Sequence, residues 1–270
     1  MKILLNNDDL NEALYNVRNV GFVPTMGSIH RGHLSLIKRS LNECNRTIVS
    51  IFVNPTQFNN KNDFKKYPRN FKKDLIILKK LKIDFVYLPS INDIYSYKRS
   101  TKIKIDKKNI ILCAKFRKGH FEGVIDVMDR LTGLIRPKKI FMGEKDFQQL
   151  YLVRKYLKKN HRSKIIGCKT IREKNKLALS SRNLRLSKTQ LIKASKFIKN
   201  IMNIKKKFKK KDNFNKILYY KKKELSKLYN IKIEYLEFRN MKNLKLSNKL
   251  ENSKIFLAYY LDKVRLIDNF

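Results

Sequence analysis

The chain has 270 residues, of which 42% are hydrophobic, and it carries a formal net charge of +42. This length and apolar content are enough to bury a core of real size, which excludes a disordered basic tail. Such a charge often accompanies nucleic-acid binding, but here the lysines are spread along the whole chain rather than gathered in one stripe. We interpret the charge as drift of tolerant surface positions in an AT-rich coding genome.

The cellular compartment is suggested by what the sequence lacks. It contains no run of 18 apolar residues, and residues 1–10 include Asp8 and Asp9 instead of an apolar segment. We therefore expect neither a signal peptide nor a membrane span. The three cysteines, Cys44, Cys113 and Cys168, are far apart and lack metal-ligand spacing. This usage predicts a cytoplasmic protein.

Strands and helices alternate over the first two thirds of the chain. A short helix over 8–19 leads to a strand at 20–23, and Leu34, Ile37 and Leu41 define the apolar face of the next helix. Further strands are predicted at 47–53, 84–89, 139–142 and 165–166, with helices at 71–81, 125–135 and directly after 146. This order indicates an α/β fold with a Rossmann-like, doubly wound parallel sheet. In such sheets ligands bind beyond the carboxyl ends of the strands.

The remainder of the chain predicts a smaller α+β domain. Ser187 and Gln190 form a capping-box pattern at the start of a long basic helix. A second helix follows at 213–228, and strands are predicted at 231–238 and 255–261. We therefore expect a catalytic domain over 1–174 and a C-terminal domain over 175–270 that covers the active site.

The most informative stretch is 22–33, Phe-Val-Pro-Thr-Met-Gly-Ser-Ile-His-Arg-Gly-His. A strand that enters a helix through a glycine turn presents unpaired backbone N–H groups, which suit a phosphate. His30 and His33 could donate hydrogen bonds to an oxyanion that gains charge during a reaction. The same pattern also fits a histidine that only caps the helix. A zinc pair lacks the remaining ligands of a zinc site.

Three more polar clusters follow strands or lie at the domain junction, at 54–57, 143–149 and 179–183. Five of the eight glycines lie in or beside these loops or the Gly-His-Phe turn at 119–121. In a chain so poor in glycine, this placement suggests a backbone that must approach a ligand closely.

Together the four motifs resemble the pantothenate synthetase (pantoate–β-alanine ligase) family. They are Pro24-Thr-Met-Gly-Ser-Ile-His-Arg-Gly-His33, Val53-Asn-Pro-Thr-Gln-Phe58, Gly143-Glu-Lys-Asp-Phe-Gln-Gln149 and Leu179-Ser-Ser-Arg-Asn183. The ending Val264-Arg-Leu-Ile-Asp-Asn269 is similar as well. His-x-Gly-His alone occurs across many nucleotidyltransferases, whereas four motifs in this order are specific.

The resemblance implies an AMP-forming ligase that uses ATP and Mg²⁺ to join pantoate and β-alanine through a pantoyl adenylate. It assigns catalysis to His30, His33, Lys145 and Arg182, with His33 as general acid. It places ATP on Met26, Gly27, His30, Gly32, His33, Gly143, Glu144, Lys145, Asp146, Ile171, Leu179, Ser180, Ser181 and Arg182. It places pantoate and β-alanine on Asn54, Gln57, Tyr67 and Gln149. It also implies a homodimer with small-molecule substrates, with no specific nucleic acid and no membrane as partner.

Three positions depart from the family pattern. Lys73 replaces one member of an acidic pair, so only Asp74 remains as a carboxylate that could assist magnesium. Cys113 stands where a Glu is common, although Arg117, Gly119 and His120 persist. Lys176 replaces a glycine before the Leu-Ala-Leu-Ser-Ser segment, which we expect to stiffen the loop that covers ATP.

Two other functions fit parts of the sequence. One is an adenylyltransferase or an aminoacyl-tRNA synthetase fragment with the same histidine signature, but no Lys-Met-Ser-Lys-Ser-like loop follows. The other is a basic RNA-binding protein without catalysis. That function predicts exposed aromatics interleaved with arginine, whereas here lysine predominates and the aromatics lie mostly in apolar strand runs.

Overall fold

The computed structural model describes residues 1–59, 64–65, 67–97 and 102–270. The chain divides into two units, Met1–Lys169 and Thr170–Phe270. The division predicted from the sequence lay at 174/175, and the roles of the two units stay predictions. Each unit is described separately below.

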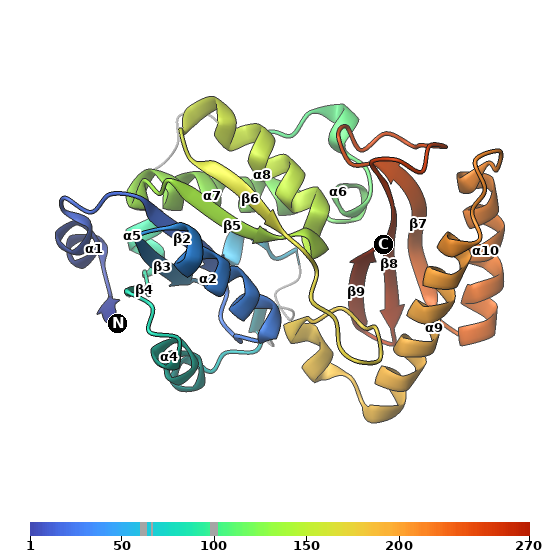
Figure 1. Ribbon diagram of the computed structural model, residues 1–270, viewed down its shortest axis with the longest axis horizontal. Helices are drawn as coiled ribbons and strands as arrows, with labels where there is room; N and C mark the ends of the chain where they lie inside the picture. The colour runs from blue at the N-terminus through green and yellow to red at the C-terminus, as the bar shows by residue number, and fades with distance from the viewer. Residues whose placement is uncertain (60–63, 66, 98–101) are drawn as a thin grey trace. The chain divides into compact units, whose positions relative to one another are not determined.

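The first unit is built on a parallel sheet with the strand order β1-β4-β3-β2-β5-β6 (Figure 1). All of its pairings are parallel, which confirms the predicted doubly wound α/β fold. The apolar runs after 20 and 47 become its central strands, as buried parallel strands require. The strands are β1 (Lys2–Leu4), β2 (Val20–Thr25), β3 (Arg46–Ile51), β4 (Phe85–Tyr87), β5 (Lys139–Gly143) and β6 (Lys164–Cys168).

Helices cover both faces of this sheet. The α-helices are α1 (Asn7–Leu14), α2 (Arg31–Glu43), α4 (Phe71–Lys80), α5 (Ile91–Ile94), α6 (Cys113–Phe116), α7 (His120–Ile135) and α8 (Phe147–Asn160). Short 3-10 turns are η1 (Pro55–Gln57), η2 (Lys107–Asn109) and η3 (Glu144–Asp146). Ile37 of α2 and Leu78 of α4 share one buried core with Val49 and Phe141 of the sheet. Helices α1, α5 and α8 pack against α7, and α8 also contacts β5 and β6.

Several elements differ from those predicted, and three of these differences have a clear structural reason. Strand β1 was not predicted, and its three residues are ordered by pairing with β4. Helix α2 begins at Arg31 rather than His33, because His30 is its N-cap. Helix α7 begins at His120 rather than 125, since Gly119 takes a left-handed conformation (φ +81°) immediately before it.

The second unit contains an antiparallel sheet in the order β7-β8-β9 with two long helices packed on it (Figure 1). Its strands are β7 (Lys232–Asn240), β8 (Ser253–Leu261) and β9 (Val264–Asn269), and its helices are α9 (Lys188–Lys206), α10 (Phe214–Tyr229) and the 3-10 turn η4 (Ser181–Arg185). The capping box is confirmed, with Gln190 N donating to Ser187 Oγ at 3.2 Å. Phe197, Phe214, Phe238 and Tyr259 are buried in the core.

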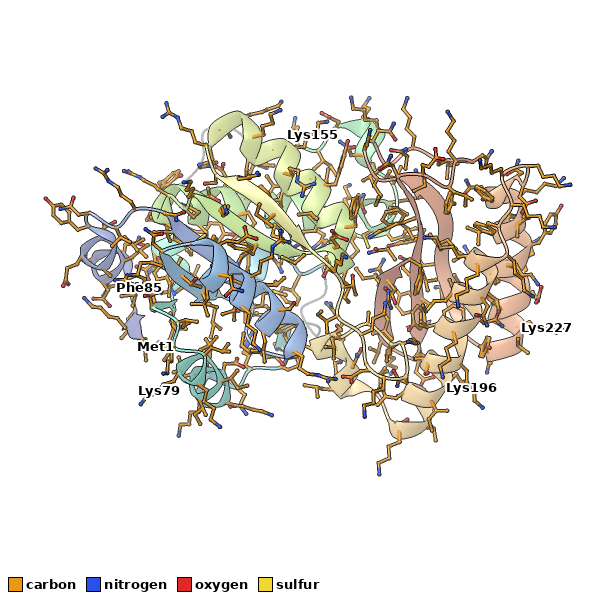
Figure 2. All side chains as sticks on the ribbon, in the orientation of Figure 1. Met1, Lys79, Phe85, Lys155, Lys196 and Lys227 are labelled. Carbon is orange, nitrogen blue, oxygen red and sulfur yellow. The ribbon has the colours of Figure 1, made fainter. Side chains whose placement is uncertain are left out.

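The basic side chains are distributed over both units. Lys79 on α4, Lys155 on α8, Lys196 on α9 and Lys227 on α10 all project outward in Figure 2. These four lysines lie on helices of both units. Among the described helices, none is long and apolar enough to cross a membrane.

Candidate active site

The loop between β2 and α2 lies at the carboxyl end of the central strand. Thr25, the last residue of β2, donates from Oγ1 to the Ser50 carbonyl on β3 at 2.7 Å and accepts the Gly27 N–H at 3.1 Å. Gly27 (φ +80°) and Ser28 (φ +54°) both have left-handed backbone conformations. A Cβ on Gly27 would lie 3.1 Å from Cγ2 of Ile51. The turn that delivers His30 to the helix therefore requires glycine at 27.

His30 and His33 both cap helix α2, each through its own Nδ1 atom. His30 Nδ1 accepts the Gly32 N–H at 3.1 Å, and His33 Nδ1 accepts the His30 N–H at 3.3 Å. The neutral form of each ring then carries its proton on Nε2. The helix cap and the oxyanion donor, which the sequence left as alternatives, thus use different nitrogens of the same side chains.

Burial determines the charge of His33. The pKa of His33 is lowered from its usual 6.5 to about 3, mainly by burial and also by the nearby His30. Asp146 opposes this shift and Lys145 adds to it, so the charges of the loop after β5 act on this ring. Without a ligand, His33 is therefore a neutral N–H donor.

The loop after β3 contains one buried amide and one partly exposed amide. Asn54 is only 1% exposed; its Nδ2 donates to the Gly123 carbonyl at 3.1 Å, and its Oδ1 accepts from Tyr95 Oη at 2.8 Å. Gln57 is partly exposed, and its Nε2 lies 2.7 Å from Sδ of Met26. The structure thus brings the predicted residues Met26 and Gln57 into contact, while Asn54 holds the loop from inside.

Helix α7 supports this loop through close backbone packing. A Cβ on Gly123 would lie 2.5 Å from the Thr56 carbonyl oxygen, so only glycine allows this approach. His120 Nδ1 lies 2.7 Å from the Gln57 carbonyl oxygen, and its Nε2 lies 2.7 Å from Nη1 of Arg117. Since a guanidinium can only donate, Nε2 accepts and Nδ1–H donates to Gln57. In the sequence, Arg117 and His120 could be recognised only as residues that persist in the family pattern. Their position at the Gly-His-Phe turn was the one sign that they matter.

The loop after β5 begins at Gly143 and contains Glu144, Lys145 and Asp146 in η3. Lys145 Nζ lies 3.5 Å from Asp146 Oδ2, with the lysine side chain 17% exposed and the carboxylate 46% exposed. The two glutamines that follow differ in environment. Gln148 is buried and donates to the Ile111 carbonyl at 2.7 Å, whereas Gln149 is partly exposed. The predicted residue Gln149 is therefore accessible to a ligand, whereas Gln148 has a structural role.

Tyr67 is buried, with 7% of its surface exposed. Its ring packs edge-on against Phe58, with centroids 5.6 Å apart. The structure therefore gives Tyr67 an aromatic packing partner, and its contact with a substrate stays a prediction.

The predicted residues of the second unit lie on one turn and the short helix after it. Leu179 N donates to the Ile171 carbonyl at 3.0 Å. Ser180 caps η4, and Ser181 and Arg182 are its first two residues. The turn before them is fixed by Arg172, whose Nη1 and Nη2 bond the two Asp268 carboxylate oxygens at 2.7 and 2.8 Å.

Lys176 lies at the tip of this turn with φ +77°. Its N–H donates to the Glu173 carbonyl at 2.8 Å, and Glu173 N–H donates to the Leu177 carbonyl at 2.8 Å. Glycine adopts this left-handed conformation without steric cost, whereas lysine does not. The departure from glycine at 176 therefore adds strain to the turn.

No metal cage is present among the residues that the structure describes. They contain no group of three or more His, Cys, Asp or Glu side chains arranged to hold an ion. Asp74, the carboxylate that remained of the expected acidic pair, is buried and accepts two backbone N–H groups. The described residues therefore do not fit a magnesium site made by protein side chains alone.

A parallel sheet with a helix-capping histidine pair, amides and a lysine at the carboxyl ends of its strands defines a nucleotide-binding type of α/β protein. Comparison with known proteins gives the family. The profile of pantoate-β-alanine ligases matches residues 2–270. The chain belongs to the pantoate-β-alanine ligase family, which confirms the resemblance in the sequence.

Relatives and solved structures agree with this assignment over their full lengths. The pantothenate synthetase of Endomicrobium trichonymphae is 41% identical over all of this chain and 97% of its own. That of Flavobacterium psychrophilum is 40% identical over 96% of this chain and 94% of its own. The crystal structure of pantothenate synthetase from Thermus thermophilus is similar with a TM-score of 0.93, 30% identity and coverage of 100% and 99%. The Francisella tularensis pantoate-β-alanine ligase, complexed with β-γ ATP and β-alanine, has a TM-score of 0.85, 37% identity and coverage of 100% and 97%.

Proposed function

We propose that this protein joins pantoate and β-alanine with consumption of ATP, releasing AMP and pyrophosphate. Family membership over residues 2–270 supports the reaction. So does the Francisella tularensis relative, whose crystal structure is a complex with β-γ ATP and β-alanine. The observation that carries the chemistry is the pair of imidazoles at the N-terminus of α2. The Gln57 amide contacts Met26, which lies in the loop that leads to these imidazoles.

In the first step, a carboxylate oxygen of pantoate attacks the α-phosphorus of ATP. The bond to the bridging oxygen breaks, pyrophosphate leaves with the electron pair, and pantoyl adenylate remains. Such a displacement depends mainly on alignment and charge stabilisation. We assign this stabilisation to His30, His33 and Lys145, together with Arg182, Ser180 and Ser181 of the second unit.

His33 enters this step as a neutral hydrogen-bond donor. Its pKa near 3 in the unliganded protein leaves no proton to give away as an imidazolium at neutral pH. A bound triphosphate places negative charge beside the ring and raises this pKa. The general-acid role implied by the family would therefore depend on nucleotide binding.

In the second step, the amine nitrogen of β-alanine attacks the carbonyl carbon of the adenylate. The bond from this carbon to the phosphate oxygen breaks, AMP leaves, and the nitrogen loses a proton to solvent. We assign pantoate to Gln57 and Gln149, whose neutral amides suit hydroxyls and a carboxylate. Asn54 would act by holding the loop, and Tyr67 by packing beside it.

The remaining nucleotide contacts are proposed from the backbone and from one carboxylate. Asp146, which is 46% exposed, would accept ribose hydroxyls. We assign the other ATP contacts to the loops of the first unit that contain Gly27, Gly32, Gly143 and Glu144. Ile171 and Leu179 are assigned to ATP from the sequence resemblance. Magnesium would be held mainly by phosphate oxygens, as in other sites where Mg²⁺ binds with a nucleotide.

A homodimer and a cytoplasmic location, both implied at the level of the sequence, belong to this proposal. One chain has a mass of 32.2 kDa. Light scattering at micromolar concentration should give about twice this mass. A result of one chain mass would remove the homodimer from the proposal.

The experiment that tests the function follows pyrophosphate and AMP separately. ATP and pantoate alone should yield pyrophosphate and an enzyme-bound adenylate, because the amine enters only in the second step. Addition of β-alanine should then release AMP and pantothenate. Pyrophosphate that forms only when β-alanine is present would contradict the two-step scheme, and no turnover with pantoate would contradict the function.

A further inference from the structure

Asp74 is a buried carboxylate outside the predicted site. It lies in the first turn of α4 and is 2% exposed. Its Oδ2 accepts the Ser28 N–H and its Oδ1 accepts the Ile29 N–H, both at 2.8 Å. A residue of α4 thus fixes two consecutive peptide groups of the loop that leads to His30.

The loop adopts a conformation that requires this support. Gly27 and Ser28 both have positive φ, which is unfavourable for the serine side chain. Consecutive N–H groups in a turn converge on an anion, and here the anion is part of the protein itself. A Cβ at Gly27 would also lie 3.0 Å from Asp74 Oδ2, so the glycine and the carboxylate fit only together.

The position of this carboxylate argues against magnesium. Mg²⁺ needs an octahedral shell of oxygens at close range and usually keeps several waters. Asp74 is almost fully covered, and each of its oxygens is directed at a backbone N–H. Its neighbour in the chain is Lys73, which cannot serve as a ligand to the ion.

We propose that Asp74 is a positioning residue for adenylate formation. It holds the turn at 27–29 and so sets where the Nε2 atoms of His30 and His33 meet the phosphate, and it does not bind magnesium. This inference rests on the proposed function. A displacement of a catalytic group by about 1 Å can reduce a rate by about a hundredfold.

Asp74→Asn is the main variant, because it keeps the shape and places an NH₂ against one of the two backbone N–H groups. Asp84→Asn is the matched control. Asp84 also accepts a backbone N–H, that of Thr47 at 2.8 Å, but it does so beside the first residues of β3 and β4. Both variants lose a charged acceptor, and only Asp74→Asn should alter the histidine loop.

The measurements are the rate of pyrophosphate release, the Mg²⁺ concentration for half activation, the melting temperature and the hydrogen exchange of the Ser28 and Ile29 amides. In Asp74→Asn the rate should fall by about tenfold to a hundredfold. The magnesium requirement should stay within about twofold, and the two amides should lose protection. Asp84→Asn should keep the rate within about twofold of the wild type, although its melting temperature should fall about as much as that of Asp74→Asn.

Two results would overturn the proposal. A large rise in the magnesium requirement, with the rate restored by excess Mg²⁺, would make Asp74 a ligand. A melting temperature lowered as in the control, with an unchanged rate and protected amides, would make its role merely structural. If Asp74→Asn does not fold, Gly27→Ala perturbs the same contact from the loop side and should give the same slow rate with unchanged magnesium dependence.

Amide exchange is measured without substrate, so it separates this proposal from the function. Wild-type protein that releases no pyrophosphate with pantoate would contradict the proposed function. In that case, faster hydrogen exchange of the Ser28 and Ile29 amides in Asp74→Asn would still support the proposal that Asp74 holds the turn at 27–29. Unchanged exchange of these amides would overturn it.

Discussion

The imidazole rings of His30 and His33 are stacked, with centroids 4.0 Å apart and planes 24° apart. Two stacked imidazoles cannot both be charged at low cost, which agrees with the lowered pKa of His33. Because both Nδ1 atoms accept backbone N–H groups, the pair has its ring N–H groups on Nε2. Each ring therefore offers an Nε2–H donor before nucleotide binds.

Replacement of His33 by alanine tests its role in the reaction. We expect His33→Ala to lower the rate of adenylate formation by about two to four orders of magnitude, the range for loss of an acid or oxyanion donor. Its free energy of unfolding should change by only about 1 kcal/mol, as for a helix cap. Pyrophosphate release and thermal melts measure the two effects. Near-normal adenylation with a much lower melting temperature would show that His33 is only a cap.

The pH dependence of stability provides a second test of this residue. The folded-state pKa of His33, about 3, lies below its usual 6.5, so the unfolded chain binds the proton first as pH falls. The contribution of His33 to the free energy of unfolding should decrease below about pH 6.5, by about 1.4 kcal/mol for each pH unit. Urea titrations of the wild type and His33→Gln should therefore converge or cross as pH falls. Parallel pH profiles of the two proteins would contradict a lowered pKa of His33 in the folded protein.

Replacement of Gln57 should affect one substrate more than the other. We expect Gln57→Ala to raise the KM for pantoate while nucleotide affinity stays nearly unchanged, because a neutral amide suits the hydroxyls and carboxylate of pantoate. Gln148→Leu is the control, since its amide is buried and bonded to the Asn109 and Ile111 carbonyls. The control should lower stability by about 1–3 kcal/mol and leave the pantoate KM in place. Equal effects on both substrates in Gln57→Ala would argue for a general collapse of the loop.

Restoring glycine at position 176 should relieve strain in the turn. Lys176 has φ +77°, so Lys176→Gly should stabilise the protein by about 0.5–1 kcal/mol after the entropic cost of glycine. Lys174→Gly, an exposed position not among those with positive φ, should be neutral or slightly destabilising. Differential scanning calorimetry compares the two variants. Destabilisation by both glycines would show that the turn is not strained at Lys176.

The sequence predicted the parallel sheet well because its strands are apolar runs. The run at 47–53 becomes β3, whereas β1, with only three residues, takes its strand conformation from β4. Strand β9, Val-Arg-Leu-Ile-Asp-Asn, mixes polar and apolar residues and was not predicted, because its sequence lacks a long apolar run. Short or edge strands depend on partners that periodicity does not reveal.

The motifs predicted which loops gather at the sheet but not which side chains are covered. His30 and His33 could be identified from their spacing, since spacing alone places both at the start of a helix. The burial of Asn54 depends on Gly123, 69 positions further along the chain. Asp74 looked like the remnant of an acidic pair, because its bonds to the loop at 28–29 come from a helix that follows 46 positions later. Contacts of this range are decided by the tertiary structure.

The pair formed by Arg172 and Asp268 has a consequence for the order of folding. The two residues are 96 positions apart, yet their bidentate contact fastens the turn at 172–178. Closing so long a loop is entropically costly, so the turn should become ordered only after β8 and β9 have paired. In pulse-labelling during refolding, the amides of Glu173 and Lys176 should gain protection last within the second unit. The turn at 172–178 would thus become ordered late, after the sheet that supports it is complete.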